Sequence, residues 1–245
     1  MTEHADKRVA LVTGANKGIG YETARRLATQ GIIVLIGARD EGRGREAAAK
    51  LQGEGLDAHF VRLDADDATT HEAAREFIEG TFGRLDILVN NAAIALELAE
   101  KPSEGSMRTL RQTFDTNFFG VVSVTQTLLP LIRQSDAGRV VNVSSGLASL
   151  TLHNDPGWDF YQVKPLAYNA SKTALNAFTV MLAHELKDTP VKVNAADPGF
   201  TATDMNGHGG HQTVEQGASI IVRLATLPAD GANGGYFNDE GVVPW

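Results

Sequence analysis

The sequence contains no cysteine, which excludes disulfide bonds, catalytic thiolates and thiolate metal sites. It also lacks any apolar run of membrane-spanning length, and its first residues, MTEHADKR, lack the apolar region of a secretory signal. Positive charge is scarce, since 22 Lys and Arg stand against 30 Asp and Glu. The resulting net charge of −8 argues against nucleic acid and anionic membranes as partners. We therefore expect a cytoplasmic protein that binds neither.

Short apolar runs alternate with amphipathic stretches along the whole chain. Its 245 residues suit one α/β domain, residues 1–245. Strands are predicted at residues 8–12, 32–38, 58–63, 85–89, 139–143, 191–195 and 235–238. Helices are predicted at residues 21–30, 42–52, 67–82, 106–134, 166–186 and 214–226. This alternation predicts a single-domain Rossmann fold, in which a doubly wound, seven-stranded parallel sheet has helices on both faces and a ligand at the carboxyl ends of its strands.

A glycine-rich segment, residues 13–20 (TGANKGIG), lies between the first strand and the first helix. A sharp strand-to-helix turn needs glycine, and the free N–H groups at the helix start favour a pyrophosphate. We therefore predict a dinucleotide site. Its expected residues are Gly14, Asn16, Lys17, Gly18, Ile19 and Gly20.

The end of the second strand indicates which dinucleotide binds. An acidic side chain there would grip the ribose 2′-hydroxyl of NAD, but this position is Ala38, followed at once by Arg39. Arg39 and Lys17 are two cations that suit the 2′-phosphate of NADPH or NADP⁺. The alternative is that both are surface cations and that Asp40 serves as the acid, which would favour NADH. The two cations favour NADPH over NADH as the cofactor.

Further residues are predicted to line the adenosine half of the cofactor. Asp64 closes the third strand and could accept from the adenine amino group, or it could belong to the cap of the next helix. Asn90, Asn91 and Ala92 lie at the end of the fourth strand and would line the adenosine and its ribose, although asparagines there can also satisfy turn backbone.

The candidate reacting centre begins with Tyr168 and Lys172, which lie four residues apart on one helix face. The ammonium is expected to lower the pKa of the phenol from its ordinary value near ~10. Ser144 and Ser145 end the fifth strand and face opposite ways, so only one points into the site. Asn117 lies mid-helix, where asparagine often binds a water or loosens the helix.

Together the motifs resemble those of the short-chain dehydrogenase/reductase family, in its NADPH-dependent carbonyl reductase branch. The matching strings are TGANKGIG, LVNNA, DTNFFG, RVVNVSS, YNASK and PGFTATDM. The resemblance implies that Tyr168 is the general acid, that Lys172 binds the nicotinamide ribose and lowers the tyrosine pKa, and that Ser145 orients the carbonyl. It implies that Asn117 holds a water linked to Lys172.

By the same resemblance, Thr203 would contact the nicotinamide carboxamide, with Pro198, Gly199 and Thr201 beside the ring. The expected activity is reduction of a ketone or aldehyde by hydride from the nicotinamide C4, reversible as an alcohol dehydrogenase. The alternative is a catalytically silent NADP(H)-binding sensor or regulator on the same fold. Ala93 and Asp197 depart from the family pattern.

Two segments are expected to shape the substrate site. An insertion at about residues 150–165 carries His153, Trp158, Phe160 and Tyr161, which either wall a pocket or cover an exposed helix. Residues at about 200–217 are predicted to form a lid. The pocket is expected to be apolar and to take an apolar or aromatic carbonyl compound. Its predicted lining comprises Ile94, Leu147, the segment around Trp158, Phe200 and Met205.

Metal binding and assembly complete the expectations. His208 and His211 lie on a glycine-rich loop without a third ligand, so no metal site is predicted. The helix at 166–186 is apolar nearly all round, which favours a homodimer or homotetramer. A monomer remains open, because the insertion could cover the same face.

Overall fold

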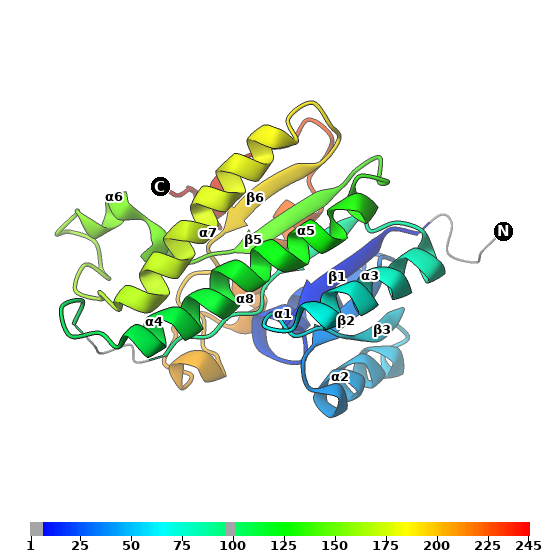
Figure 1. Cartoon of the computed structure of the whole chain (residues 1–245), viewed down its shortest axis with the longest axis horizontal. Helices are drawn as coiled ribbons and strands as arrows, with labels where there is room; N and C mark the ends of the chain where they lie inside the picture. Colours follow the sequence, from blue (N-terminus) through cyan, green and yellow to red (C-terminus); the bar gives the residue numbers. More distant parts are fainter. Residues whose placement is uncertain (1–6, 97–100) are drawn as a thin grey trace.

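The computed structural model describes residues 7–96 and 101–245, which form helices around one sheet (Figure 1). The sheet order is β3-β2-β1-β4-β5-β6-β7-β8, and β1 to β7 pair in parallel. The strands are β1 (Val9–Thr13), β2 (Ile33–Ala38), β3 (Ala58–Arg62), β4 (Ile87–Asn90), β5 (Arg139–Val143), β6 (Lys192–Ala196), β7 (Tyr236–Asn238) and β8 (Gly241–Val242).

The sheet has eight strands, so the prediction of seven was wrong by one. β8 has two residues and pairs antiparallel with β7, where Phe237 lies opposite Val242. It begins at Gly241, whose φ of 140° no other residue type adopts readily. Such a short hairpin return has no apolar periodicity by which a sequence could predict it.

The central strands explain why the predicted runs are apolar on every residue. β1, β2, β4 and β5 are buried along their whole length, because helices cover both faces of the sheet. Leu11 of β1 and Leu88 of β4 lie side by side in register and are fully buried. The order reverses beside β1, which places the carboxyl ends of β1 and β4 at the crevice where α/β sheets bind ligands.

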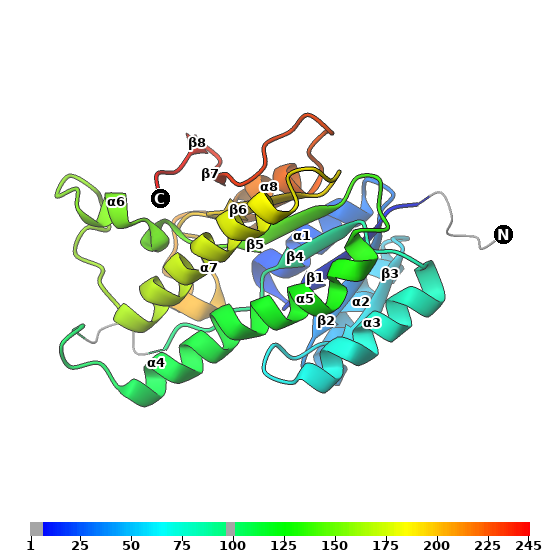
Figure 2. The same cartoon turned by 45° about the horizontal axis from the view of Figure 1, so that its top comes forward.

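The helices form two layers (Figures 1 and 2). One layer packs Leu27, Leu51 and Ile221 against the sheet, and the other packs Ile78, Leu128 and Leu182 against the opposite face. The first layer consists of α1 (Gly18–Ala28), α2 (Glu41–Gly53) and α8 (Val214–Ala225). The second consists of α3 (Ala68–Phe82), α5 (Val121–Ile132) and α7 (Leu166–Glu185), with α4 (Met107–Phe114) extending α5. Among the described residues, no helix is both long and apolar enough to cross a bilayer.

The predicted helix at 106–134 is interrupted. A π-helical turn, η1 (Asp115–Gly120), separates α4 from α5 and contains Asn117. The expected loosening around Asn117 is therefore confirmed. A π turn inside an α-helix often marks a functional position, since it shifts one residue out of the regular ladder.

Both long loops contain short ordered elements. The insertion holds α6 (Leu150–His153), after the 3₁₀ turn η2 (Gly146–Ala148). The loop after β6 holds the 3₁₀ turn η3 (Asp204–Asn206) and closes at its base, where Thr201 bridges to Gln212. Since α8 begins at Val214, the end of the predicted lid, 213–217, coincides with the cap and first turn of that helix.

Candidate active site

The glycine-rich turn has the geometry of a cradle. Gly14 and Gly18 adopt φ values of 63° and 57°, in the left-handed region that favours glycine. At Gly20, a Cβ would lie 2.8 Å from the carbonyl oxygen of Gly14. Helix α1 begins at Gly18, and the N–H groups of its first turn point out of the start of the helix. The site therefore fits a pyrophosphate group.

Hydrogen bonds from the end of β4 brace this turn. Thr13 Oγ1 accepts the N–H groups of Asn91 and Ala92 at 2.9 and 3.0 Å. The Asn91 side chain donates to the Thr13 carbonyl at 2.9 Å. Ala92 thus lies beside Gly14, and Asn91 braces the glycine-rich turn with its side chain. The predicted contacts of both residues with the adenosine stay predictions.

Asn90 was predicted to line the adenosine, and its side chain does not. It is 2% exposed and donates to Thr125 Oγ1 at 2.9 Å and to Asn142 Oδ1 at 2.8 Å. Successive strand residues face opposite sides of the sheet, so Asn90 points toward α5 while Asn91 reaches the glycine-rich turn. The sheet interior, not the cofactor, is the environment of this amide.

Asp64 lies beyond the end of β3, with its carboxylate near the sheet edge. Its Oδ1 accepts the N–H of Asp66 at 3.3 Å, while Asp67 caps α3. The Asp64 backbone carbonyl accepts from His71 Nε2 at 2.7 Å, which anchors the segment. Its contact with adenine stays a prediction.

A basic cavity of about 560 Å³ adjoins the glycine-rich turn. Its lining comprises Asn16, Lys17, Tyr21, Arg43, Glu46, Ala47, Lys50 and Asp204. Arg39, predicted to bind the 2′-phosphate, is exposed just beyond β2 and is not part of this lining. The contact of Arg39 with the 2′-phosphate stays a prediction, and the cations that line the cavity besides Lys17 are Arg43 and Lys50 of α2. Their spacing of seven residues, two helical turns, was the signal that they share one face.

The two serines after β5 point in opposite directions, as strand alternation predicts. Ser144 is buried and donates to Asn176 Oδ1 of α7 at 2.7 Å. Ser145 instead hydrogen-bonds the phenol of Tyr168, which lowers the pKa of that tyrosine. The Ser145 hydroxyl therefore lies at the reacting centre beside the tyrosine.

Burial and, to a lesser extent, the nearby Asp197 raise the pKa of Tyr168 to about 12 despite the hydrogen bond from Ser145. The expected lowering by Lys172 is not found. The Lys172 ammonium lies 5.9 Å from the centre of the tyrosine ring and donates to the Val143 carbonyl at 2.7 Å. Lys172 is 2% exposed, and burial lowers its pKa to about 8. Tyr168 and Lys172 lie on one helix face, but the Lys172 ammonium is hydrogen-bonded to the Val143 carbonyl.

Asn117 joins three elements at this centre. Its Oδ1 accepts the N–H of Ile94 at 2.8 Å, and its Nδ2 donates to the Ile94 carbonyl at 2.9 Å and to Ser171 Oγ at 3.1 Å. Both backbone groups of Ile94 are thereby satisfied. The water predicted at Asn117 stays a prediction.

The loop after β6 runs over the glycine-rich turn. Gly199 has a φ of 70°, and Thr201 Oγ1 donates to the Pro198 carbonyl at 3.0 Å. The Thr203 methyl group lies 3.9 Å from the position that a Cβ on Gly18 would take. Thr203, one of the predicted nicotinamide contacts, therefore lies beside the cradle.

Aromatic side chains connect the insertion to this loop. Ring centroids are 5.7 Å apart for Trp158 and Phe160, 5.6 Å for Phe160 and Phe200, and 5.9 Å for Phe200 and His211. Within the insertion, His153 accepts from Lys164 Nζ at 2.8 Å. This continuous row favours the pocket wall over a simple cover for a helix.

Leu147 and Met205, two further predicted pocket residues, lie in η2 and η3. His153 lies 2.9 Å from the Leu147 carbonyl, while Met205 is 43% exposed within η3. His208 Nε2 lies 2.9 Å from the Asp204 carboxylate, whereas the His211 ring packs against Phe200. The two histidines therefore have separate partners.

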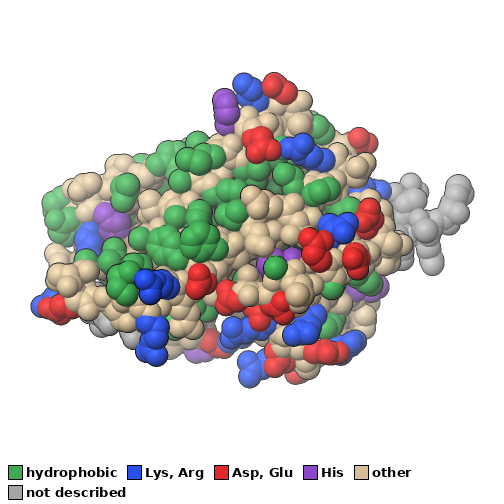
Figure 3. Space-filling view, in the orientation of Figure 1, with side chains coloured by type: hydrophobic (Ala, Val, Ile, Leu, Met, Phe, Trp, Pro, Cys, Tyr) green, Lys and Arg blue, Asp and Glu red, His purple; other side chains and the backbone are tan. Residues whose placement is uncertain are grey.

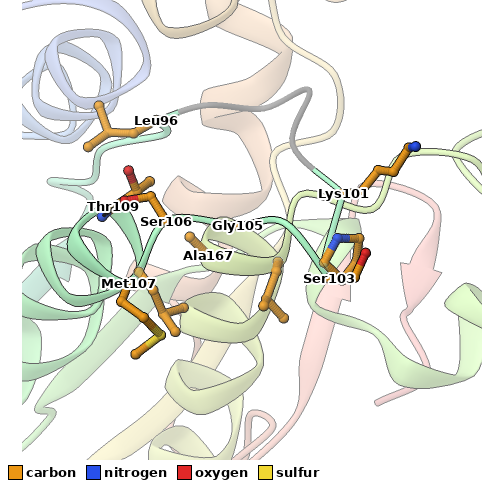
Figure 4. A pocket seen from close by; sticks show the side chains of 11 residues that line it. Leu96, Lys101, Ser103, Gly105, Ser106, Met107, Thr109 and Ala167 are labelled. Atoms are coloured by element: carbon orange, nitrogen blue, oxygen red, sulfur yellow. Dashed lines mark hydrogen bonds between the residues drawn. The ribbon is translucent and has the colours of Figure 1, made fainter.

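A second cavity, of about 260 Å³, opens between α4 and the start of α7 (Figure 4). Leu96, Met107 and Ala167 are among its lining residues, together with Ser106 and Leu166. One lining residue, Ala167, directly precedes Tyr168 in the sequence, but neither Tyr168 nor Ser145 lines the cavity. The cavity is thus adjacent to the reacting centre and distinct from it.

Comparison with known proteins agrees with this geometry. The family model described as short chain dehydrogenase matches residues 8–213. The rat protein carbonyl reductase [NADPH] 1 is 35% identical, over 98% of this chain and 99% of its own length. An NADPH-bound carbonyl reductase from chicken fatty liver superposes with a TM-score of 0.85 at 25% identity, covering 98% of this chain and 99% of that one.

A plant relative matches equally broadly. The structure of salutaridine reductase from Papaver somniferum superposes with a TM-score of 0.82 at 32% identity, over 95% of this chain and all of that one. Fold, motif order and near-complete coverage agree. The chain is therefore an oxidoreductase that belongs to the short chain dehydrogenase family.

Proposed function

We propose that this protein is an NADPH-dependent carbonyl reductase that also runs in reverse as an alcohol dehydrogenase. The observation that carries the proposal is the hydrogen bond of Ser145 to Tyr168 at the carboxyl end of β5, on the sheet edge where β1 also ends in the glycine-rich turn. Relatives that are named as NADPH carbonyl reductases support it.

The preference for NADPH follows from the basic cavity. Lys17, Arg43 and Lys50 line it against the two carboxylates of Glu46 and Asp204. Lys17 and Lys50 pair with these carboxylates, and a 2′-phosphate would add negative charge beside all three cations. Charge-assisted hydrogen bonds to phosphate are strong. The glycine-rich turn would hold the pyrophosphate of the cofactor, and the cavity would hold the 2′-phosphate on its adenosine ribose.

The bound nicotinamide supplies a hydride to the carbonyl carbon. Tyr168 donates its proton to the carbonyl oxygen, so that the product is an alcohol. The hydroxyl of Ser145 holds the same oxygen, where negative charge develops during reduction. In the reverse direction, Tyr168 takes the proton from the alcohol. With its raised pKa the phenol is protonated at neutral pH and has a proton to donate.

The substrate class follows from the wall beside this centre. Trp158, Phe160 and Phe200 present aromatic surface, which suits a medium-sized apolar or aromatic carbonyl compound. We also propose that the insertion, 150–165, serves as pocket wall and that the loop from 200 serves as lid.

Assembly is a separate proposal. Hydrophobic side chains gather over the ridge of α4, α5 and α7 (Figure 3), where Met107, Val180 and Met181 are exposed. Such a patch supports a homodimer or homotetramer over a monomer. Light scattering after size exclusion would decide among them.

The test combines binding and turnover. Calorimetry with NADPH and NADH would measure cofactor preference, and nicotinamide absorbance would follow reduction of a panel of ketones and aldehydes. NADPH preference with turnover is the expected result. Tight binding of NADPH without turnover of any carbonyl would overturn the proposal and favour a sensor.

A further inference from the structure

Asp197, one of the residues that depart from the family pattern, lies at the reacting centre. It follows β6, and its backbone N–H donates to the Phe237 carbonyl at 2.8 Å. Its Oδ1 accepts the N–H of Gly199 at 3.0 Å, and the carboxylate also accepts the N–H of Gly146. Its charge raises the pKa of Tyr168, so the carboxylate lies near the phenol.

This carboxylate has no cationic partner among the described residues. The other charged side chain that acts on it is Glu240, which, like burial, raises the pKa of Asp197. Lys172, the cation of this centre, donates to the Val143 carbonyl instead. An enclosed carboxylate without a counter-charge is costly. Two backbone N–H groups hold it in place, and its remaining lone pairs stay free for a ligand.

Aromatic side chains adjoin the carboxylate. A Cβ built on Gly146 would lie 3.1 Å from Asp197 Oδ2 and 3.5 Å from the Trp158 ring, so the carboxylate and the ring pack side by side against Gly146. From Trp158 the aromatic row continues through Phe160 to Phe200. A carboxylate next to aromatic rings is the combination that binds alkylammonium groups, by charge and by cation–π attraction.

We infer that Asp197 makes this protein selective for carbonyl substrates that carry a cationic amino group. The inference rests on the proposed reductase function and specifies its substrate class. The ammonium lies against Asp197 and Trp158, while the carbonyl oxygen lies at Ser145 and Tyr168. The substrate thereby supplies the counter-charge that the protein lacks, and the aromatic row accommodates its apolar body.

The experiment compares two ketones of matched shape. In γ-dimethylaminobutyrophenone the amine is protonated at neutral pH, and in isoheptanophenone an isopropyl group replaces it. We expect the wild-type protein with NADPH to favour the cationic ketone by about tenfold in kcat/KM, mainly through KM, as one charge-assisted contact provides. In Asp197→Asn this ratio falls to about one.

Asp159→Asn is the matched control, because Asp159 is an exposed carboxylate of the same insertion and its loss leaves the ratio unchanged. Equal turnover of both ketones by the wild type would overturn the inference. So would an equal loss for both in Asp197→Asn, which is the signature of a purely structural carboxylate. If NADPH binds and neither ketone reacts, the proposed function fails. Calorimetric binding of the two ketones then tests the charge preference directly.

Discussion

The carboxylate of Asp204 holds the ammonium of Lys17 at 2.5 Å, across 187 residues of sequence. Its other oxygen lies 2.9 Å from His208 Nε2. The contact ties the loop after β6 to the glycine-rich turn, at the edge of the basic cavity. Lys17 is therefore engaged by a carboxylate at the position where a cofactor phosphate is proposed to bind, and the two compete for it.

Removing this competitor should strengthen NADPH binding. An ion pair between such exposed groups contributes little, so Asp204→Asn should raise NADPH affinity only modestly, by about fivefold at most. NADH affinity should stay the same, since NADH has no 2′-phosphate. Calorimetry measures both constants. Asp57→Asn, which breaks the surface pair with Lys7, is the control. An equal gain for both cofactors would contradict the competition.

The cavity lining predicts which arginine recognises the phosphate. Arg43→Met should weaken NADPH binding by about tenfold or more, and Arg39→Met should weaken it less, because only Arg43 lines the cavity. The ratio of NADPH to NADH dissociation constants is the measurement. A larger effect at Arg39 would restore the assignment made from sequence.

Tyr168→Phe should remove the proton donor without disturbing packing. General acid catalysis contributes about 10²–10⁴-fold, so kcat for carbonyl reduction should fall by that order while NADPH affinity persists. Nicotinamide absorbance and calorimetry separate the two effects. Tyr161→Phe, in the insertion, serves as the control and should retain activity. Full activity of Tyr168→Phe would exclude the proposed acid.

The pH profile should report Lys172. Burial lowers its pKa to about 8, so it is charged below pH 8 and neutral above, whereas Tyr168 with a pKa of about 12 stays protonated throughout. We expect kcat/KM for reduction to be level at neutral pH and to fall as pH rises through about 8. Lys172→Arg, if active, should move this limb upward, because arginine stays charged. A profile that is flat to pH 10 would refute the assignment.

Asn117 should contribute to stability as well as to the site. Asn117→Leu leaves the N–H and carbonyl of Ile94 without partners, and each unpaired group costs about 1–3 kcal/mol. We expect a loss of about 2 kcal/mol or more in the free energy of unfolding, measured with urea. Asn154→Ala, which removes one exposed bond to Leu150, should change it little. Equal effects would argue against the anchoring role.

The sequence predicted the fold well, because each central strand is buried on both faces. A strand such as β2 must be apolar at every residue, and this run is visible without knowing its neighbours. The left-handed turn at Gly14 is equally local, since only glycine adopts it readily. For the same reason, the positions of Tyr168 and Lys172 on one helix face followed from spacing alone.

Contacts between distant segments decided the rest. Whether Asn90 or Asn91 faces the cradle depends on strand register, and whether Arg39 or Arg43 lines the cavity depends on how α2 packs beside β2. The pKa of Tyr168 depends on burial and on Asp197, which arrives from another strand end. Composition and spacing determined the elements and the kind of site, because these depend on local geometry. Only the tertiary structure decided which side chains contact one another and how their pKa values shift, because both depend on which strand ends meet.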